Sequence, residues 1–575
     1  MNPSTAFAGV MVDELIRGGV QHAVLAPGSR SAPVALALSS AERSGRLRLH
    51  VRTDERSAGF LALGLAKGSG RPVPVLTTSG TAAAHLHAAV LEASYSGVPL
   101  IALTADRPPE MRGTGANQTI DQVGLYGDAV RFFADVDVPE RRTGSNDGWR
   151  RVVCTALTRA SGVLGGRPGA VHLNLPLRAP LLPGIPESDD QHAAEEPWPE
   201  SLEGRADGQP WMLTQRPRDD GDVGPRFVHA DNGQPTWMVL GDTTAEVSGL
   251  AVDVAVRHGW PILAEPTGNA GTSAVPGYLG LLESQSFMAR HGPRRVICVG
   301  RPTLSRAVQA LLADEDVQVD RFAFGPQWTG RSRPIDELRG HDSGRVDAAG
   351  GDTGTALVEL LATAGEAFAD HQDRIVDEAY LGGAKVARDL VRLLPDGSRL
   401  FLGSSNPIRD VDRYAAPRDG VQMLGNRGVA GIDGSISTAA GLALAAPGRP
   451  TFALIGDLTF LHDLGGLMIP DSEARPDLRI VVVDNRGGGI FAQLEPGRPE
   501  YEQDYERVFG TPHSLDLVLV ARSLGWPAEE VTRAGQLPAA LQRHGPQVIV
   551  VRTNQRADAE VLRRVRNVPE NLLDQ

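Results

Sequence analysis

The sequence predicts an α/β protein built from three doubly wound parallel-sheet domains. Short apolar runs alternate with helical patterns along the chain, which is typical of βαβ units. At 575 residues the chain is longer than one hydrophobic core normally serves. Two stretches rich in Gly and acidic residues, 183–235 and 340–354, interrupt the pattern. We therefore expect a first domain at 1–185, a central domain with a loop-rich linker at 186–360, and a third at 361–575.

Strand-like apolar runs indicate where each sheet lies. They occur at 23–26, 73–77 and 98–104, then at 236–240, 261–264, 295–299 and 319–324, and finally at 399–402, 450–455, 478–483 and 547–551. In the first domain each run is followed by a turn of Gly, Ser or Asp, and the first two runs then enter Ala/Leu-rich helical patterns. Open α/β sheets bind ligands beyond the carboxyl ends of their strands, so these turns are where functional residues are expected.

The composition excludes several classes of protein. The net charge is −13 and no basic block occurs, which argues against nucleic acid as the main partner. Cys154 and Cys298 are too few for a disulfide framework and wrongly spaced for zinc, so we expect two buried free thiols. No apolar run reaches the roughly 18 residues of a membrane span. Asp13 and Glu14 interrupt the amino-terminal pattern as no signal peptide would, so a cytoplasmic location is expected.

The most informative segment is 450–494. Its first strand-like run ends in Gly456-Asp457, and its second ends in Asp484-Asn485-Arg486 followed by three glycines. Adjacent parallel strands would bring the acid and the amide to neighbouring carboxyl ends. Mg²⁺ prefers oxygen ligands and binds few carboxylates together with phosphates. Asp457, Asn485 and a carbonyl at Gly487 would supply such ligands. The alternative is that Asp457 caps a helix and the glycines only turn the chain.

In this segment Asn485 follows Gly456-Asp457 by 28 residues from the Asp. This arrangement resembles the diphosphate- and metal-binding motif of thiamine-diphosphate enzymes. The resemblance implies that Gly456, Asp457, Leu458 and Asn485 contact thiamine diphosphate. Gly456 would let the backbone approach closely, and the helix that follows would donate N–H groups to the diphosphate. It also implies that Mg²⁺, or Mn²⁺ in its place, binds Asp457, Asn485 and Gly487.

The same family has an amino-terminal domain that binds the pyrimidine ring and contributes one essential glutamate. Glu55 matches, since it lies between a strand-like HVR and a helical pattern. Such a carboxyl group hydrogen-bonds the ring nitrogen and favours the tautomer that deprotonates the thiazolium carbon. The alternative for Glu55 is an acid in the first turn of a helix, favoured by the helix dipole. Ile432 would be the apolar wedge beneath the cofactor, with core packing as its alternative.

Several stretches resemble one branch of that family, the menaquinone-pathway synthases that join 2-oxoglutarate to isochorismate. They are APGSRSAP (26–33), RTDER (52–56), TSGTAAA (78–84), LTADRPPE (103–110), GANQTIDQ (115–122), NRGVAGIDGSIST (426–438), GDLTFLHD (456–463) and GGGIF (487–491). The resemblance covers both outer domains well and 190–360 poorly. It implies a transferase that decarboxylates 2-oxoglutarate and adds the succinyl carbanion to isochorismate. It also implies an active site shared between two chains, hence a homodimer at least and a homotetramer as a further option.

Both substrates are dianions, so the cleft needs fixed cations, and Arg binds carboxylates through two parallel hydrogen bonds. By resemblance the substrate-binding residues are Ser29, Arg30, Arg107, Gln118, Arg306, Ser405, Arg409 and Arg427, with Ile490, Phe491 and Leu494 as a wall that excludes water. Because Lys67 and Lys385 are the only lysines among 57 basic residues, any single Arg can equally be structural.

Two positions depart from the family pattern. Ser305 stands where a Lys is common, and Arg486 stands where Asn or Asp is common. We expect Arg486 to point away from the metal, which would repel it. We expect His85, His87 and His462 to have packing or surface roles, since none has a partner at metal-binding spacing.

Three other functions compete with this one. A sister thiamine-diphosphate enzyme, such as an acetolactate synthase or a 2-oxo acid decarboxylase, would not need so many arginines. A non-catalytic scaffold of the same fold would have lost Glu55 or the Asp457/Asn485 pair, yet all three are present. A nicotinamide dehydrogenase needs G-x-G-x-x-G between a strand and a helix, and the GNRGVAG string at 425–431 lacks that spacing.

Overall fold

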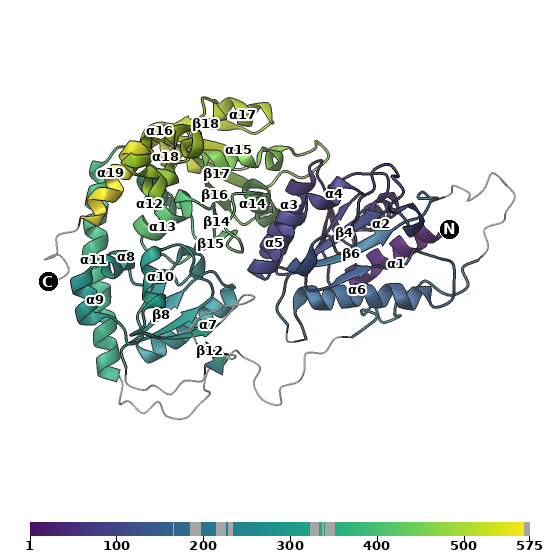
Figure 1. The fold of residues 1–575 in the computed structure, drawn as a ribbon, viewed down its shortest axis with the longest axis horizontal. Helices are drawn as coiled ribbons and strands as arrows, with labels where there is room; N and C mark the ends of the chain where they lie inside the picture. Colours follow the sequence, from purple (N-terminus) through teal and green to yellow (C-terminus); the bar gives the residue numbers. More distant parts are fainter. Residues whose placement is uncertain are drawn as a thin grey trace. The chain divides into compact units, whose positions relative to one another are not determined.

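The computed structural model describes residues 1–164, 166–183, 197–213, 226–227, 234–322, 333–335, 338–339 and 351–567 (Figure 1). Most of the predicted linker at 183–235 and of the stretch at 340–354 lies outside these ranges. The chain packs into two compact units. Unit 1 comprises 1–218, 428–448 and 463–477, and unit 2 comprises 219–427, 449–462 and 478–575. In the described residues, no helix is both long and apolar enough to cross a membrane.

Unit 1 contains a six-stranded parallel sheet in the order β2-β1-β3-β4-β6-β5. Its strands are β1 (His22–Leu25), β2 (Arg48–Val51), β3 (Val73–Thr77), β4 (Leu100–Asp106), β5 (Phe133–Asp135) and β6 (Val171–Pro176). Its helices are α1 (Pro3–Arg17), α2 (Ala32–Arg43), α3 (Glu55–Ser69), α4 (Thr81–Ala84), α5 (His87–Ser96), α6 (Ser145–Ser161) and α14 (Ser435–Ala445). Helices α1, α2 and α6 share one core with the sheet, whereas α3 and α5 also pack on its strands.

Helices α3 and α14 cross closely although their sequences are far apart. Gly64 of α3 faces the backbone of Thr438, and Gly441 of α14 faces the backbone of α3. A Cβ at Gly64 would come within 2.8 Å of the Thr438 carbonyl carbon and would overlap its oxygen. The interface therefore depends on glycine at both positions.

Unit 2 contains two parallel sheets. The first has the order β12-β11-β10-β8-β9 and the second the order β15-β14-β16-β17-β19-β18. The first sheet is made of β8 (Thr236–Leu240), β9 (Ile262–Ala264), β10 (Arg295–Val299), β11 (Gln318–Phe322) and β12 (Arg333–Ile335). The second is made of β14 (Arg399–Leu402), β15 (Gln422–Gly425), β16 (Thr451–Gly456), β17 (Leu478–Asp484), β18 (Ala528–Val531) and β19 (Gln547–Arg552). A short antiparallel pair, β7 (Arg226–Phe227) and β13 (Leu338–Arg339), lies outside both sheets.

Helices cover both faces of the first sheet in unit 2, as two separate hydrophobic clusters show. The helices of this unit are α7 (Ala245–His258), α8 (Tyr278–Glu283), α9 (Gln285–His291), α10 (Arg306–Ala313), α11 (Gly351–Glu378), α12 (Gly383–Leu393), α13 (Asn406–Tyr414), α15 (Asp457–His462), α16 (Glu502–Tyr505), α17 (Leu517–Ser523), α18 (Leu537–Leu541) and α19 (Gln555–Arg566). The predicted α/β class with three parallel sheets is confirmed.

Every predicted strand is present within two residues, as far as the structure describes it, and several further strands were not predicted. Strand β6 is buried throughout, but its His172 and Asn174 break the apolar run that pattern reading depends on. Strands β15 and β18 lie at the two edges of their sheet and carry polar residues. An edge strand needs fewer apolar side chains than a central strand, so the run of apolar residues that indicates a strand is weak there.

Candidate active site

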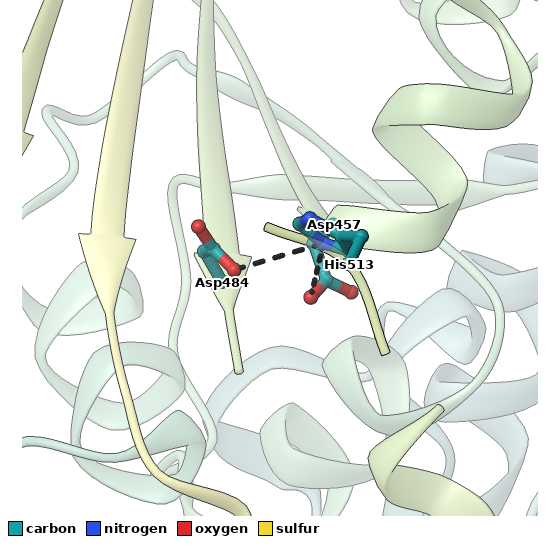
Figure 2. A group of neighbouring side chains, drawn as sticks. All are labelled: Asp457, Asp484 and His513. Atoms are coloured by element: carbon teal, nitrogen blue, oxygen red, sulfur yellow. Dashed lines mark hydrogen bonds and ion pairs between the residues drawn. The ribbon is translucent and has the colours of Figure 1, made fainter. Parts of the chain in front are cut away.

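The predicted metal motif lies at one edge of the second sheet in unit 2. Strands β16 and β17 are parallel neighbours, and Gly456 pairs with Val483. This pairing places Asp457, the first residue of α15, beside Asp484 and Asn485 at the end of β17. Figure 2 shows His513 between the carboxylates of Asp457 and Asp484. The strand arrangement inferred from the sequence is therefore present.

Asp457 is buried and accepts three hydrogen bonds. Its Oδ1 accepts from the Leu458 N–H at 2.7 Å, and its Oδ2 accepts from the Gly487 N–H at 2.8 Å. His513 Nε2 lies 3.2 Å from the same Oδ2 (Figure 2). Burial raises the pKa of Asp457 to about 6, and nearby Asp484 adds to the rise. A desolvated carboxylate of this kind gains from a neighbouring cation.

Two sets of groups could hold that cation. Ligand atoms of Asp457, Asp484 and His513 lie within 4.8 Å of one another. Asp484, however, forms an ion pair with Arg552 and accepts from the Arg486 N–H at 3.0 Å. By contrast, the buried Oδ1 of Asn485 has no hydrogen-bond partner among the described residues. Because the Asp484 charge is already balanced while the Asn485 oxygen is unsatisfied, Asp457 and Asn485 fit a hard cation better.

The glycines after Asn485 shape this edge. Gly487 has a φ of +145°, and a Cβ there would overlap the carbonyl oxygen of Gly510. Only glycine can therefore bring its N–H to Asp457. The Gly487 carbonyl, which the resemblance assigned to the metal, accepts from the Gly489 N–H at 2.9 Å. Arg486 is exposed.

Gly456 and Leu458, the two predicted cofactor-binding residues beside Asp457, differ in whether a ligand could contact them. A Cβ at Gly456 would meet no atom within 4 Å, so space for a ligand exists beside it. The Leu458 N–H, however, donates to Asp457 and is not free for a diphosphate. His513, in the irregular segment before α17 and 28 residues after Asn485, is a member of this edge that the sequence analysis missed. No local pattern marks it, because its place depends on how residues 486–512 fold back.

Four of the predicted substrate residues line one cavity in unit 2. The cavity has a volume of about 460 Å³, and its walls include Arg306, Arg409, Ile490 and Leu494. Partial burial and the neighbouring Arg427 lower the pKa of Arg409. Arg306 keeps 76% of its side chain exposed and pairs with Glu495 at 2.8 Å. The cavity thus combines cations with an apolar wall, as carboxylate substrates require.

Arg427 and Ser405 lie near this cavity without lining it. Arg427 is buried, and its Nη2 donates to Thr303 Oγ1 at 2.5 Å. Ser405 has a φ of +77°, rare for a residue with a side chain, and its carbonyl accepts from Arg409 at 2.8 Å. Phe491 packs against Phe509 with a ring-centroid distance of 5.8 Å. Ser305, found where the family often has Lys, caps α10 by accepting from the Ala307 N–H.

Glu55 begins helix α3 in unit 1. Asp54 caps the helix by accepting from the Ser57 N–H at 3.2 Å. Glu55 is half-buried, and its carboxylate has no partner among the described residues. The first-turn position expected from the helix dipole is therefore observed, and it leaves the carboxylate available to a ligand.

Ser29, Arg30, Arg107 and Gln118 lie in the segments that follow β1 and β4, and Gln118 also contacts the segment after β3. Burial and the nearby Arg107 lower the pKa of Arg30, whose Nη1 donates to the Leu177 carbonyl at 2.7 Å. Arg107 donates to the Asn117 carbonyl at 2.9 Å. Gln118, with a φ of +55°, donates to the Ser79 carbonyl at 3.0 Å. Ser29 is exposed beside Arg30, and Ile432 is half-buried in the turn before α14.

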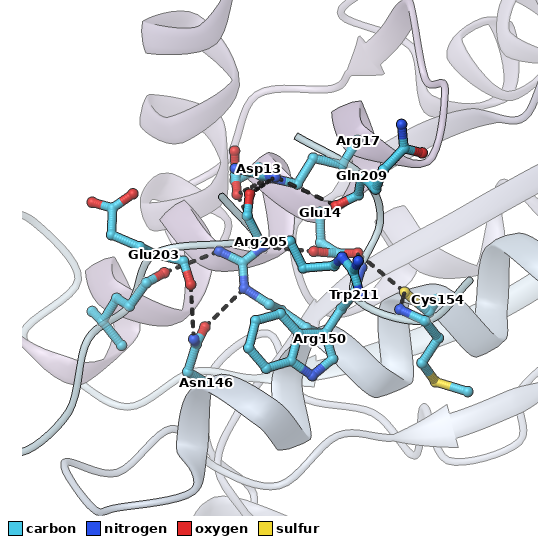
Figure 3. Close-up of polar contacts among 12 residues, drawn as sticks. Asp13, Glu14, Arg17, Asn146, Arg150, Cys154, Glu203, Arg205, Gln209 and Trp211 are labelled. Atoms are coloured by element: carbon cyan, nitrogen blue, oxygen red, sulfur yellow. Dashed lines mark hydrogen bonds and ion pairs between the residues drawn. The ribbon is translucent and has the colours of Figure 1, made fainter. Parts of the chain in front are cut away.

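A cluster of buried polar contacts around Arg150 in unit 1 stabilises the fold and contains none of the predicted site residues (Figure 3). Arg150 is 1% exposed and donates to Glu14 at 2.6 Å and to Asp13 at 2.9 Å. It also donates to the Leu202 carbonyl, so it fastens the segment 197–213 to α1 and α6. Cys154 donates to Glu14, and burial raises the pKa of its thiol to about 12. Both cysteines are free and buried, as predicted.

Comparison with known proteins shows that the chain is a thiamine-diphosphate-dependent enzyme, and its α/β fold of parallel sheets is consistent with this class. Residues 5–125 match the family described as "Thiamine pyrophosphate enzyme, N-terminal TPP binding domain", and residues 408–551 match its C-terminal TPP binding domain.

Similarity to individual proteins indicates which group of thiamine-diphosphate enzymes this chain belongs to. The chain is 46% identical to the 2-succinyl-5-enolpyruvyl-6-hydroxy-3-cyclohexene-1-carboxylate synthase of Saccharopolyspora erythraea, over 96% of each chain. It is 47% identical to the synthase of that name from Thermobifida fusca over 98% of each, and 41% identical to that of Mycobacterium marinum over 98% of each. The chain belongs to this family of synthases.

Proposed function

We propose that this protein decarboxylates 2-oxoglutarate on thiamine diphosphate and transfers the succinyl unit to isochorismate. The products are 2-succinyl-5-enolpyruvyl-6-hydroxy-3-cyclohexene-1-carboxylate and CO₂, in menaquinone biosynthesis. The observation that carries the proposal is similarity along nearly the whole chain to synthases of that product. The arginine-lined cavity supports it, because both substrates carry two carboxylates.

Asp457 and Asn485 would hold a divalent cation, which we propose is Mg²⁺ with Mn²⁺ as a substitute. The unsatisfied Asn485 oxygen and the desolvated Asp457 carboxylate are the donors such an ion requires. When bound, thiamine diphosphate supplies the electron sink for loss of CO₂ and the carbon nucleophile. The open space beside Gly456 fits a diphosphate approaching the ion.

The other residues act on protons and substrates. Glu55, unpaired in the first turn of α3, would hydrogen-bond the pyrimidine nitrogen and hold a proton there. Arg306, Arg409 and Arg427 would bind substrate carboxylates, and so would Arg30 and Arg107 of unit 1. Ser29, Gln118 and Ser405 would add hydrogen bonds. Ile490, Phe491 and Leu494 would keep water away from the reacting carbon, so that the succinyl unit is transferred to isochorismate and not protonated.

Product analysis tests the reaction directly. The protein is incubated with thiamine diphosphate, Mg²⁺ and 2-oxoglutarate, with and without isochorismate, and the products are identified by mass spectrometry. We expect CO₂ release in both cases and the cyclohexene carboxylate only when isochorismate is present. Turnover of pyruvate to acetolactate, with no use of 2-oxoglutarate, would instead assign the protein to the sister enzymes.

We further propose a homodimer in which each active site combines Glu55 of one chain with Asp457 of the other. Mixing tests this arrangement. Glu55→Gln and Asp457→Asn chains are each expected to be inactive, whereas a heterodimer of the two regains one intact site. Refolded mixtures that stay as inactive as their parents would contradict the shared site. Refolded wild-type protein is the control.

A further inference from the structure

Glu265 is a buried acid that neither the sequence motifs nor the proposed reaction uses. It follows β9 directly and is 2% exposed. Its Oε1 accepts two hydrogen bonds, from the N–H groups of Thr303 and Leu304, each at 2.7 Å. Its Oε2 is buried without a hydrogen-bond partner among the described residues. One carboxyl oxygen therefore fastens the turn that follows β10 to the end of β9.

The turn held by Glu265 carries groups that matter to the substrate cavity. Thr303 Oγ1 accepts from Arg427 Nη2 at 2.5 Å. Two residues further on, Ser305 caps α10, and Arg306 is the first residue of that helix. Thr303, Ser305 and Arg306 all line the 460 Å³ cavity. A shift of this turn would therefore move Arg306 and release Arg427 together.

The surroundings of Glu265 disfavour a second charge. It lines a smaller cavity of about 160 Å³ together with Tyr278 and Asp412, and Tyr278 donates to Asp412 at 2.8 Å. Burial, reinforced by Asp412, raises the pKa of Glu265 to about 8. The raised pKa favours the protonated form, and Oε1 is the acceptor for both backbone N–H groups. A glutamine side chain has the same shape and can do the same.

We infer that Glu265 is a positioning residue: it holds the Thr303–Arg306 turn so that Arg427 and Arg306 are aligned for the substrate carboxylates. The inference rests on the proposed function, which assigns those arginines to the substrates. Glu265 itself touches neither the cavity of the arginines nor the metal edge. Its effect should therefore appear in substrate binding and not in cofactor binding.

The test compares Glu265→Gln with Glu265→Leu. Steady-state KM and kcat are measured for 2-oxoglutarate and isochorismate, together with the affinity for thiamine diphosphate and the melting temperature. Glutamine should keep KM within about twofold of wild type. Leucine removes the acceptor and should raise KM for at least one substrate about tenfold or more, as expected when a charge-assisted hydrogen bond is misaligned. Cofactor affinity should stay unchanged.

Asp320→Asn is the matched control. Asp320 is a buried acid on β11, paired with Arg295 at 2.7 Å and absent from the lining of either cavity. The Asp320→Asn substitution should lower the melting temperature without changing KM, as expected for a residue that only stabilises the fold. If Glu265→Leu does not fold, Thr303→Val tests the next contact: it removes the hydroxyl that accepts from Arg427, keeps the backbone N–H that Glu265 binds, and should also raise KM.

The outcomes separate the two proposals. A wild-type protein that does not use 2-oxoglutarate and isochorismate refutes the proposed function. A wild-type protein that does, with KM unchanged in Glu265→Leu or in Thr303→Val, refutes the positioning role alone. A KM that rises equally in the Gln and Leu variants also refutes it. Glutamine keeps the shape and the hydrogen-bond acceptor of Glu265, so the proposed role predicts a rise only for leucine.

Discussion

Replacing Gly64 with alanine tests whether the α3–α14 crossing stabilises unit 1. The new Cβ would lie 2.8 Å from the Thr438 carbonyl carbon and 2.9 Å from its Cα, besides overlapping the carbonyl oxygen. Ordinary contacts of this kind are 3.4 to 4 Å, so the helices must separate by about 1 Å. The neighbouring atoms belong to backbone, which cannot rotate away as a side chain can.

The magnitude follows from two opposing effects. Overpacking of a close-packed interior costs about 1–3 kcal/mol, and a backbone clash belongs at the upper end. Alanine in place of glycine inside a helix returns about 1 kcal/mol. We therefore expect the free energy of unfolding of Gly64→Ala to fall by about 2 kcal/mol. Activity should fall as well, because α3 carries Glu55 in its first turn.

The assay is urea-induced unfolding, with thermal melting as a second measure. Gly9→Ala is the matched control, because Gly9 lies in α1, is exposed, and a Cβ there would point into open space with no packed neighbour within 4 Å. That variant should gain about 0.5–1 kcal/mol from the helix propensity of alanine. If Gly64→Ala were as stable as Gly9→Ala, the close crossing of α3 and α14 would be refuted.

Four further predictions concern single residues. Glu55→Gln should fold and bind thiamine diphosphate with Mg²⁺ but lose turnover severely, measured as CO₂ release from 2-oxoglutarate; near-normal turnover would overturn its assignment. Asn485→Ala should weaken Mg²⁺-dependent binding of thiamine diphosphate about tenfold or more in calorimetry, and unchanged affinity would remove it from the metal site. Arg150→Met should lower the free energy of unfolding by about 3–5 kcal/mol, because the Glu14 carboxylate stays buried without its ion-pair partner; a loss below 1 kcal/mol would contradict this. Burial raises the pKa of Asp463 to about 6, above the 3.8 of an ordinary Asp, so its contribution to stability is largest at low pH and declines as pH rises through that range. Between pH 7 and pH 5 the wild type should therefore gain about 1 kcal/mol relative to Asp463→Asn in urea unfolding, and parallel pH profiles would show that the shift is absent.

The sequence alone predicted the features that depend on local pattern. The alternation of apolar runs and helical patterns located the strands, because the strands at the centre of a parallel sheet are buried on both faces. The same rule placed Asp457 and Asn485 at neighbouring strand ends, and β16 and β17 are indeed adjacent and parallel. Glu265 was missed although it follows a predicted strand, since no partner motif in the sequence drew attention to it.

Other features were decided only by the tertiary structure. The hydrogen bonds from Thr303 and Leu304 to Glu265, the contact of His513 with Asp457, and the crossing of α3 and α14 all join segments that are distant in sequence. A periodic pattern tells which face of a strand or helix is buried, but not which other element covers it. Which element covers a given face depends on the order of strands in each sheet and on how closely the helix backbones fit together. Both become known only from the folded structure.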